Sequence, residues 1–102
     1  MSAPPDLLRR RYDMVARLSE ITSQLQKFHQ ARMSAEMDVQ RIEMTPDGAA
    51  RDLREELNEA HSRLQSADEA ITGCEARLAE IEARLDETDR EIAALSGRRT
   101  SP

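Results

Sequence analysis

Two heptad stripes run along this chain, and they are out of phase with each other across Thr45-Pro46-Asp47-Gly48. The first stripe comprises Leu7, Arg11, Met14, Leu18, Ile21, Leu25, Phe28, Arg32, Ala35, Val39 and Ile42. The second comprises Ala50, Leu53, Leu57, Ala60, Leu64, Ala67, Ile71, Cys74, Leu78, Ile81, Leu85, Thr88, Ile92 and Leu95. Stripes that alternate steps of four and three residues form the seam of a coiled coil, because each side chain inserts between residues of a facing helix. The pattern therefore predicts an all-α protein with two long helices.

The composition agrees with this fold class. Charged residues make up 34% of the 102 residues and aromatic residues only 2%, which together with the helical periodicity is typical of coiled coils. The length allows one small domain. A net charge of −5 argues against non-specific binding of nucleic acid over the whole surface, but it permits a local basic patch.

The phase break favours a chain reversal over one continuous helix. A stutter in a single bent helix is the alternative explanation. However, Pro46 cannot donate a backbone hydrogen bond, and Gly48 loosens the chain beside it. Thr45 as N-cap, with Pro46 at the first helical position, is a good start for a second helix. We therefore expect an antiparallel two-helix coiled-coil hairpin.

The expected boundaries follow from these signals. The helices should span about residues 5–44 and 46–96, because a glycine after the second stripe is a helix stop. The predicted segments are a flexible N-terminus at 1–4, a coiled-coil hairpin at 5–96 with its turn near 43–48, and a flexible tail at 97–102. The predicted core consists of Leu18, Ile21, Leu25, Phe28, Val39, Leu53, Leu57, Leu64, Ile71 and Leu78.

The position of the turn also predicts a register. In an antiparallel pair the numbers of two facing seam residues add to a constant, which is 92 if Val39 faces Leu53 and Leu7 faces Leu85. Residues 88–96 would then overhang the first helix by about 12 Å, at about 1.5 Å per residue. The overhang would leave Ile92 and Leu95 without a partner in the chain.

The flanks of the seam predict where a partner binds. One flank is basic and carries Arg10, Arg17, Arg77 and Arg84. The other is acidic and carries Asp68, Glu75, Glu82 and Asp89. A second apolar stripe comprises Leu8, Tyr12 and Val15. The predicted oligomer or partner interface consists of this apolar stripe, Ile92, Leu95, the four arginines, Glu75, Glu82 and Asp89. It is expected there because a two-helix hairpin buries only one face of each helix.

Three arrangements remain open for this interface. The charges can simply be solvated, since surface ion pairs contribute only about 0–1 kcal/mol each. Alternatively, the basic edge of one hairpin meets the acidic edge of another, which builds a ring or a filament. An isologous four-helix dimer that buries the apolar residues is equally permitted.

Two histidines and two carboxylates lie close along one flank. His29 and His61 face each other there, with Glu36 and Asp68 one heptad further on. Such residues can hold zinc, but the spacing lacks a ligand pair on one helical turn. We therefore expect interhelical histidine–carboxylate contacts, with no metal and no cofactor.

Three seam residues are unusual for a coiled coil. Cys74 is expected to behave as a small apolar residue, and as the single cysteine it excludes an internal disulfide. Arg11 and Arg32 weaken the packing of the seam but can fix its register by reaching acids on the flank.

Two exposed surfaces are further candidates for binding. Met33, Met37 and Met44 lie on the outer face near the turn, where flexible thioethers can form an adaptable docking surface or be ordinary exposed residues. Arginines at 9–11 and 98–99 can contact nucleic acid phosphates, but no aromatic side chains accompany them for base stacking. Direct binding of nucleic acid is therefore the less favoured reading.

The sequence predicts a non-enzymatic structural or adaptor protein. It lacks a nucleophile–base pair, a phosphate-binding loop and metal-ligand spacing, and a two-helix rod has no enclosed pocket. We expect self-association through coiled-coil surfaces, docking of a protein partner, no membrane span and a cytoplasmic location. By shape alone, the hairpin is also similar to those of ring-forming, small-terminase-like DNA-packaging proteins and to secretion or export stalks and chaperones. These are the alternative functions.

Overall fold

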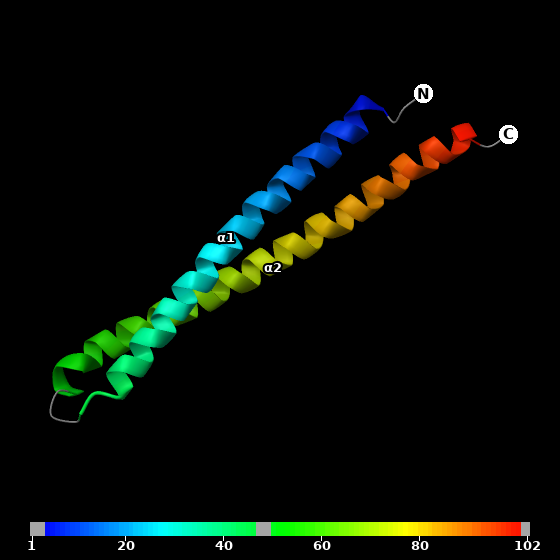
Figure 1. The fold of residues 1–102 in the computed structure, drawn as a ribbon. Coiled ribbons are helices and arrows are strands. Elements are labelled where there is room, and N and C mark those ends of the chain that lie inside the picture. The colour runs from blue at the N-terminus through cyan, green and yellow to red at the C-terminus, as the bar shows by residue number, and fades with distance from the viewer. Residues whose placement is uncertain (1–3, 47–49, 101–102) are drawn as a thin grey trace. The chain divides into compact units, whose positions relative to one another are not determined.

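The computed structural model confirms the all-α helical hairpin. It describes residues 4–46 and 50–100, and the side chains of residues 4–46 and 53–97. Helix α1 (Pro5–Glu43) and helix α2 (Ala50–Thr100) run in opposite directions and pack against each other (Figure 1). The described residues contain no β-strand.

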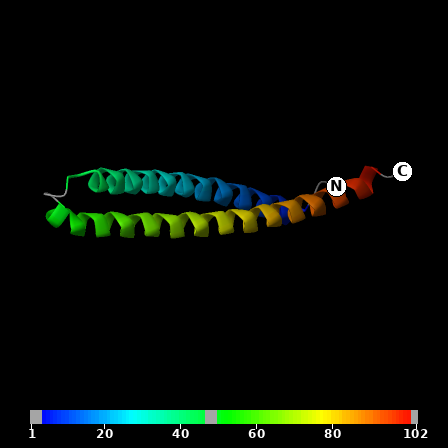
Figure 2. The ribbon, with the colours of Figure 1, turned by 90° about the horizontal axis from the view of Figure 1, so that it is seen from below.

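The chain divides into two compact units. The terminal unit comprises Met1–Ser23 and Glu75–Pro102, and the turn unit comprises Gln24–Cys74. Within each unit a stretch of α1 lies beside a stretch of α2, as the colours from blue to cyan and from green to red show (Figure 2). Each unit therefore has its own two-helix seam.

The predicted seam is confirmed in both units. In the turn unit the buried residues are Ala35, Val39, Ile42, Ala60, Ala67, Ile71 and Cys74. In the terminal unit they are Leu7, Ile21, Ile81 and Thr88. Every other seam residue with a described side chain is half-buried, except Arg11 and Arg32, which are exposed. Removal of this apolar surface from water is the main force that holds the helices together.

The first turn of α1 has the residues that a helix start requires. Pro5 stands at the first helical position, where its missing N–H costs nothing. Asp6 follows in the first turn, where a negative charge is favoured. The N–H groups of Leu7 and Leu8 donate to the carbonyl of Pro4 at 3.0 and 3.3 Å.

The segment between the helices differs from the prediction. Helix α2 begins at Ala50, not at residue 46, and Pro46 lies outside both helices. The hydroxyl of Thr45 donates to the carbonyl of Arg41 at 2.9 Å, so it closes the end of α1 instead of capping α2. The prediction of Thr45 as N-cap is therefore wrong, and Asp47 and Gly48 lie outside the described residues.

The end of α2 also differs from the prediction. The helix continues through Gly97 to Thr100, so this glycine does not stop it. A glycine inside a helix costs only about 1 kcal/mol relative to alanine. Of the predicted flexible ends at 1–4 and 97–102, residues 97–100 belong to α2, and residues 1–3 and 101–102 lie outside the described part of the chain.

The register differs by one heptad from the one predicted, as four interhelical ion pairs show. The numbers of the bonded residues add to 100 in Arg11–Asp89 and Arg32–Asp68, to 101 in Asp38–Arg63 and to 97 in Arg41–Glu56. Facing seam residues can add only to 92, 99 or another value a heptad away, because the stripe repeats every seven residues. A sum of 92 would displace Asp89 by about 12 Å along the axis from its bonded arginine. In the observed register the numbers of two facing seam residues therefore add to 99.

Burial near the chain ends supports the corrected register. Thr88 is only 7% exposed, and Ile92 and Leu95 are half-buried within the terminal unit. The overhang therefore does not begin at residue 88, because at a sum of 99 Pro5 faces residue 94 and only residues 95–100 of α2 extend beyond α1. At a sum of 99, Ile92 faces Leu7, so it packs inside the hairpin and is not an unpartnered interface residue.

Candidate interaction surfaces

The seam arginines reach acids on the flank, as predicted. Arg11 Nε lies 2.8 Å from Asp89 Oδ1, and Arg32 Nε lies 2.6 Å from Asp68 Oδ1. In the observed register Arg11 faces Thr88 and Arg32 faces Ala67. Both facing residues are small, which leaves room for the arginine to pass over the seam to the adjacent aspartate. The role of these pairs in fixing the register stays a prediction.

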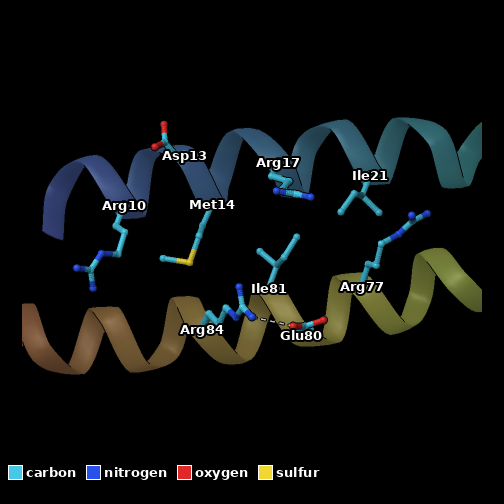
Figure 3. A pocket seen from close by; sticks show the side chains of 9 residues that line it. All are labelled: Arg10, Asp13, Met14, Arg17, Ile21, Arg77, Glu80, Ile81 and Arg84. Carbon is cyan, nitrogen blue, oxygen red and sulfur yellow. Dashed lines mark hydrogen bonds and ion pairs between the residues drawn. The ribbon is translucent and has the colours of Figure 1, made fainter. Parts of the chain in front are cut away.

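The basic flank of the terminal unit forms an open groove, the arginine groove, of about 340 Å³. Its rim carries Arg10, Arg17, Arg77 and Arg84, together with Asp13 and Glu80. Its floor consists of Met14, Ile21 and Ile81, which point between the two helices (Figure 3). Arg84 Nη2 bonds Glu80 Oε1 at 2.9 Å along α2. The groove can therefore receive an occupant that is apolar at its centre and negative at its edges.

The opposite flank of the terminal unit combines apolar and acidic residues, and we name it the acidic–apolar face. Its apolar members, Leu8, Tyr12 and Val15, are 47%, 74% and 42% exposed. Its acidic members are Glu75, Glu82 and Asp89, which recur every seventh residue of α2 and so share one side of the helix. Exposed apolar residues that lie together with a polar rim are a candidate interaction surface.

The turn unit carries a second groove, of about 510 Å³, which the sequence did not suggest. Small side chains line most of it, including Ala31, Ser34, Ser62 and Ser66, with Phe28 at the seam. The one feature of the sequence that indicates this groove is the shortness of these side chains, because short side chains leave the flank of the seam uncovered.

Asp38 and Arg63 form the interhelical ion pair of the turn unit that affects a pKa. Arg63 Nη2 donates to Asp38 Oδ2 at 2.8 Å, and this hydrogen bond lowers the pKa of Asp38 below its usual 3.8. Desolvation opposes the shift, and the charges of Arg63 and Arg41 add to it. The pair therefore favours the folded state only while Asp38 is ionised.

Asp38→Asn is expected to lower the melting temperature slightly at pH 7 and not at pH 2. A carboxyl group with a lowered folded-state pKa stabilises the fold above its unfolded pKa, and this stability is lost as the pH falls through the folded value. Thermal unfolding followed by circular dichroism at both pH values measures the difference. Asp86→Asn, on the exposed side of α2, is the matched control. An equal effect of Asp38→Asn at the two pH values would contradict the ionic origin.

The remaining predicted sites divide into exposed and buried residues. Met33 and Met37 are exposed on α1, and Met44 is exposed directly after its end. Their role as a docking surface stays a prediction. Cys74 is fully buried in the seam, as predicted. His29 and His61 are exposed, and the described residues contain no group of three side chains that could hold a metal ion. Asp68 is bonded to Arg32, so the expected histidine contact is not the one that the structure shows for this acid.

Comparisons with protein-family models, characterised proteins and solved structures find no match to this chain. Of the helical residues that the structure describes, no stretch is long and apolar enough to cross a membrane. The surfaces themselves therefore carry the functional argument.

Proposed function

We propose that the protein is a non-enzymatic structural protein that acts by self-association of its coiled-coil surfaces and by docking of a protein partner. The exposed strip of Leu8, Tyr12 and Val15 carries this proposal. A packing of two helices buries one stripe of each and is only marginally stable alone. A second copy that covers the strip removes further apolar surface from water and so stabilises the fold.

The chemistry of the strip suits a helix–helix contact. The three residues follow each other at i, i+4 and i+7, so they form one row along α1. Tyrosine can bury its ring against a partner while its hydroxyl stays at the wet edge of the interface. The exposed methionines of the turn unit supply a separate surface for a different protein.

The proposal is tested by the absolute mass in solution. Light scattering across a concentration series should give at least twice the single-chain mass of 11.6 kDa. Tyr12→Ser with Val15→Ser should shift the protein toward the monomer, because the strip loses most of its apolar area. Met33→Ser with Met37→Ser removes similar exposed area elsewhere on α1 and should change nothing. A wild-type mass of 11.6 kDa at every concentration would contradict self-association.

A second candidate function rests on the arginine groove. Four guanidinium groups on one surface can bind the phosphates of a nucleic acid. This feature supports the role of an oligomeric component of a nucleic-acid machine, in spite of the negative net charge. Binding of a short DNA duplex that weakens steeply with salt would support it.

The single, buried cysteine suits the reducing cytoplasm that we propose as the location.

A further inference from the structure

The arginine groove carries an excess of positive charge, because its four arginines outnumber the carboxylates of Asp13 and Glu80 on the same rim. In the turn unit, Asp38 and Arg63 meet across the flank, and their numbers add to 101. In the terminal unit, the numbers of Arg17 and Arg84 also add to 101, so these two arginines occupy the corresponding positions, and both line the groove. An aspartate–arginine bond in one unit thus corresponds to two facing arginines in the other. Facing like charges repel, so an anionic occupant of the groove is favoured.

The acidic–apolar face has the opposite imbalance. Asp89 is neutralised by Arg11, with which it forms a 2.8 Å bond. Glu82 lies one heptad earlier on α2, and the residue of α1 that corresponds to Arg11 at this level is Leu18, since both pairs of numbers add to 100. Leu18 cannot neutralise the carboxylate of Glu82. The face therefore presents an exposed carboxylate beside its exposed apolar strip.

We propose that the arginine groove of one copy binds the acidic–apolar face of a second copy of this chain. This inference rests on the proposed self-association and names its two surfaces. The charges are opposite, and both sets repeat every seven residues, which is about 10 Å along a helix. The apolar strip of the face can cover the half-buried Met14 and the remaining exposed edges of Ile21 and Ile81 on the floor of the groove.

Charge also decides between this contact and the symmetric ones. Two faces in contact would oppose glutamate to glutamate, and two grooves would oppose arginine to arginine, which is unfavourable in either case. Face and groove lie on opposite flanks of the seam, so each copy donates one surface and receives one. Such a contact is heterologous, and it closes into a ring or continues as a filament.

The test reverses each surface separately and then mixes the two variants. Arg17→Glu with Arg84→Glu turns the groove acidic, and Glu75→Arg with Glu82→Arg turns the face basic. Each variant alone should associate at least tenfold more weakly than the wild type in sedimentation velocity at low salt. An equimolar mixture should regain association, because the acidic groove of one variant then meets the basic face of the other.

Two controls keep the result interpretable. Arg9→Glu with Arg90→Glu makes the same change in net charge as the groove variant, one residue on each helix, on the outward side of the terminal unit, and should leave association unchanged. Circular dichroism should show equal helix content in all variants, because every substituted side chain is exposed.

The possible failures are distinguishable. A monomeric wild type would overturn the proposed self-association and this inference together. An oligomer that persists in both reversed variants would overturn this inference alone and place the contact elsewhere. A monomeric wild type that binds a DNA duplex through Arg17 and Arg84 would identify nucleic acid as the occupant of the groove.

Discussion

Ile71→Ala is expected to destabilise the fold by about 2–5 kcal/mol. Ile71 is 8% exposed in the seam of the turn unit, so nearly all of its side chain is removed from water. Truncation removes three buried carbon atoms and leaves a cavity that two stiff helices cannot fill. Small domains have a total stability of about 5–15 kcal/mol, and a two-helix hairpin lies at the low end. Urea unfolding followed by circular dichroism should therefore show a much earlier transition, with part of the variant unfolded before urea is added.

Met37→Ala is the matched control for this substitution. Met37 is 63% exposed on the outer side of α1 in the same unit, and it loses as many heavy atoms when it becomes alanine. Substitutions at such surface positions usually change stability by less than about 0.5 kcal/mol. A loss from Met37→Ala as large as that from Ile71→Ala would show that the seam does not carry the stability of the hairpin.

The seam was predictable because apolar periodicity is a local property of the sequence. Each helix must bury one stripe, and the spacing of four and three residues identifies it without knowledge of the partner. The two exposed exceptions, Arg11 and Arg32, were also expected to reach acids on the flank. The sequence therefore predicted which face of each helix is buried.

The register was harder to predict because a heptad pattern is nearly unchanged when one helix slides by seven residues. Sums of 92 and 99 both place apolar residues opposite apolar residues, so the choice of 92 depended on the predicted position of the turn. Pro46 suggested a tight reversal, whereas six residues separate the end of α1 from the start of α2. Helix α2 is thereby displaced, and Thr45 belongs to the end of α1.

A signal for the correct register was nevertheless present in the sequence. Arg11 and Arg32 are separated by three heptads, and so are Asp68 and Asp89. Only one register pairs both arginines with both aspartates, and it is the observed one. Charges on the flank can thus identify a register that the apolar seam leaves open.

The candidate surfaces were predictable only in part. The opposed basic and acidic flanks follow from the heptad positions of their residues. The arginine groove does not, because its volume depends on how side chains on two helices are staggered across the seam. The position of Ile92 was predicted wrongly for the same reason, since the register decides whether it extends beyond α1 or packs against it. The contact of Ile92 and Leu95 with a partner stays a prediction.

A disulfide between the two helices tests the register directly. Val39→Cys with Ala60→Cys, in a Cys74→Ala background, places the two thiols in facing seam positions at a sum of 99. Oxidation should form an intrachain disulfide and stabilise the hairpin by about 3 kcal/mol, because the unfolded chain loses the entropy of a loop of about 20 residues. Non-reducing gel electrophoresis detects the bond, and urea unfolding with and without reductant measures the stabilisation.

Val39→Cys with Leu53→Cys is the matched control, since it places the thiols opposite each other only at a sum of 92. In the observed register Leu53 is one heptad away, about 10 Å along the axis. That displacement exceeds the separation of about 7 Å beyond which two Cα atoms cannot be bridged. An efficient intrachain disulfide in the control, and none in the first variant, would show that the shorter register is correct. Covalent dimers of the first variant would show instead that the two helices exchange between chains, because the same seam contacts then form between copies.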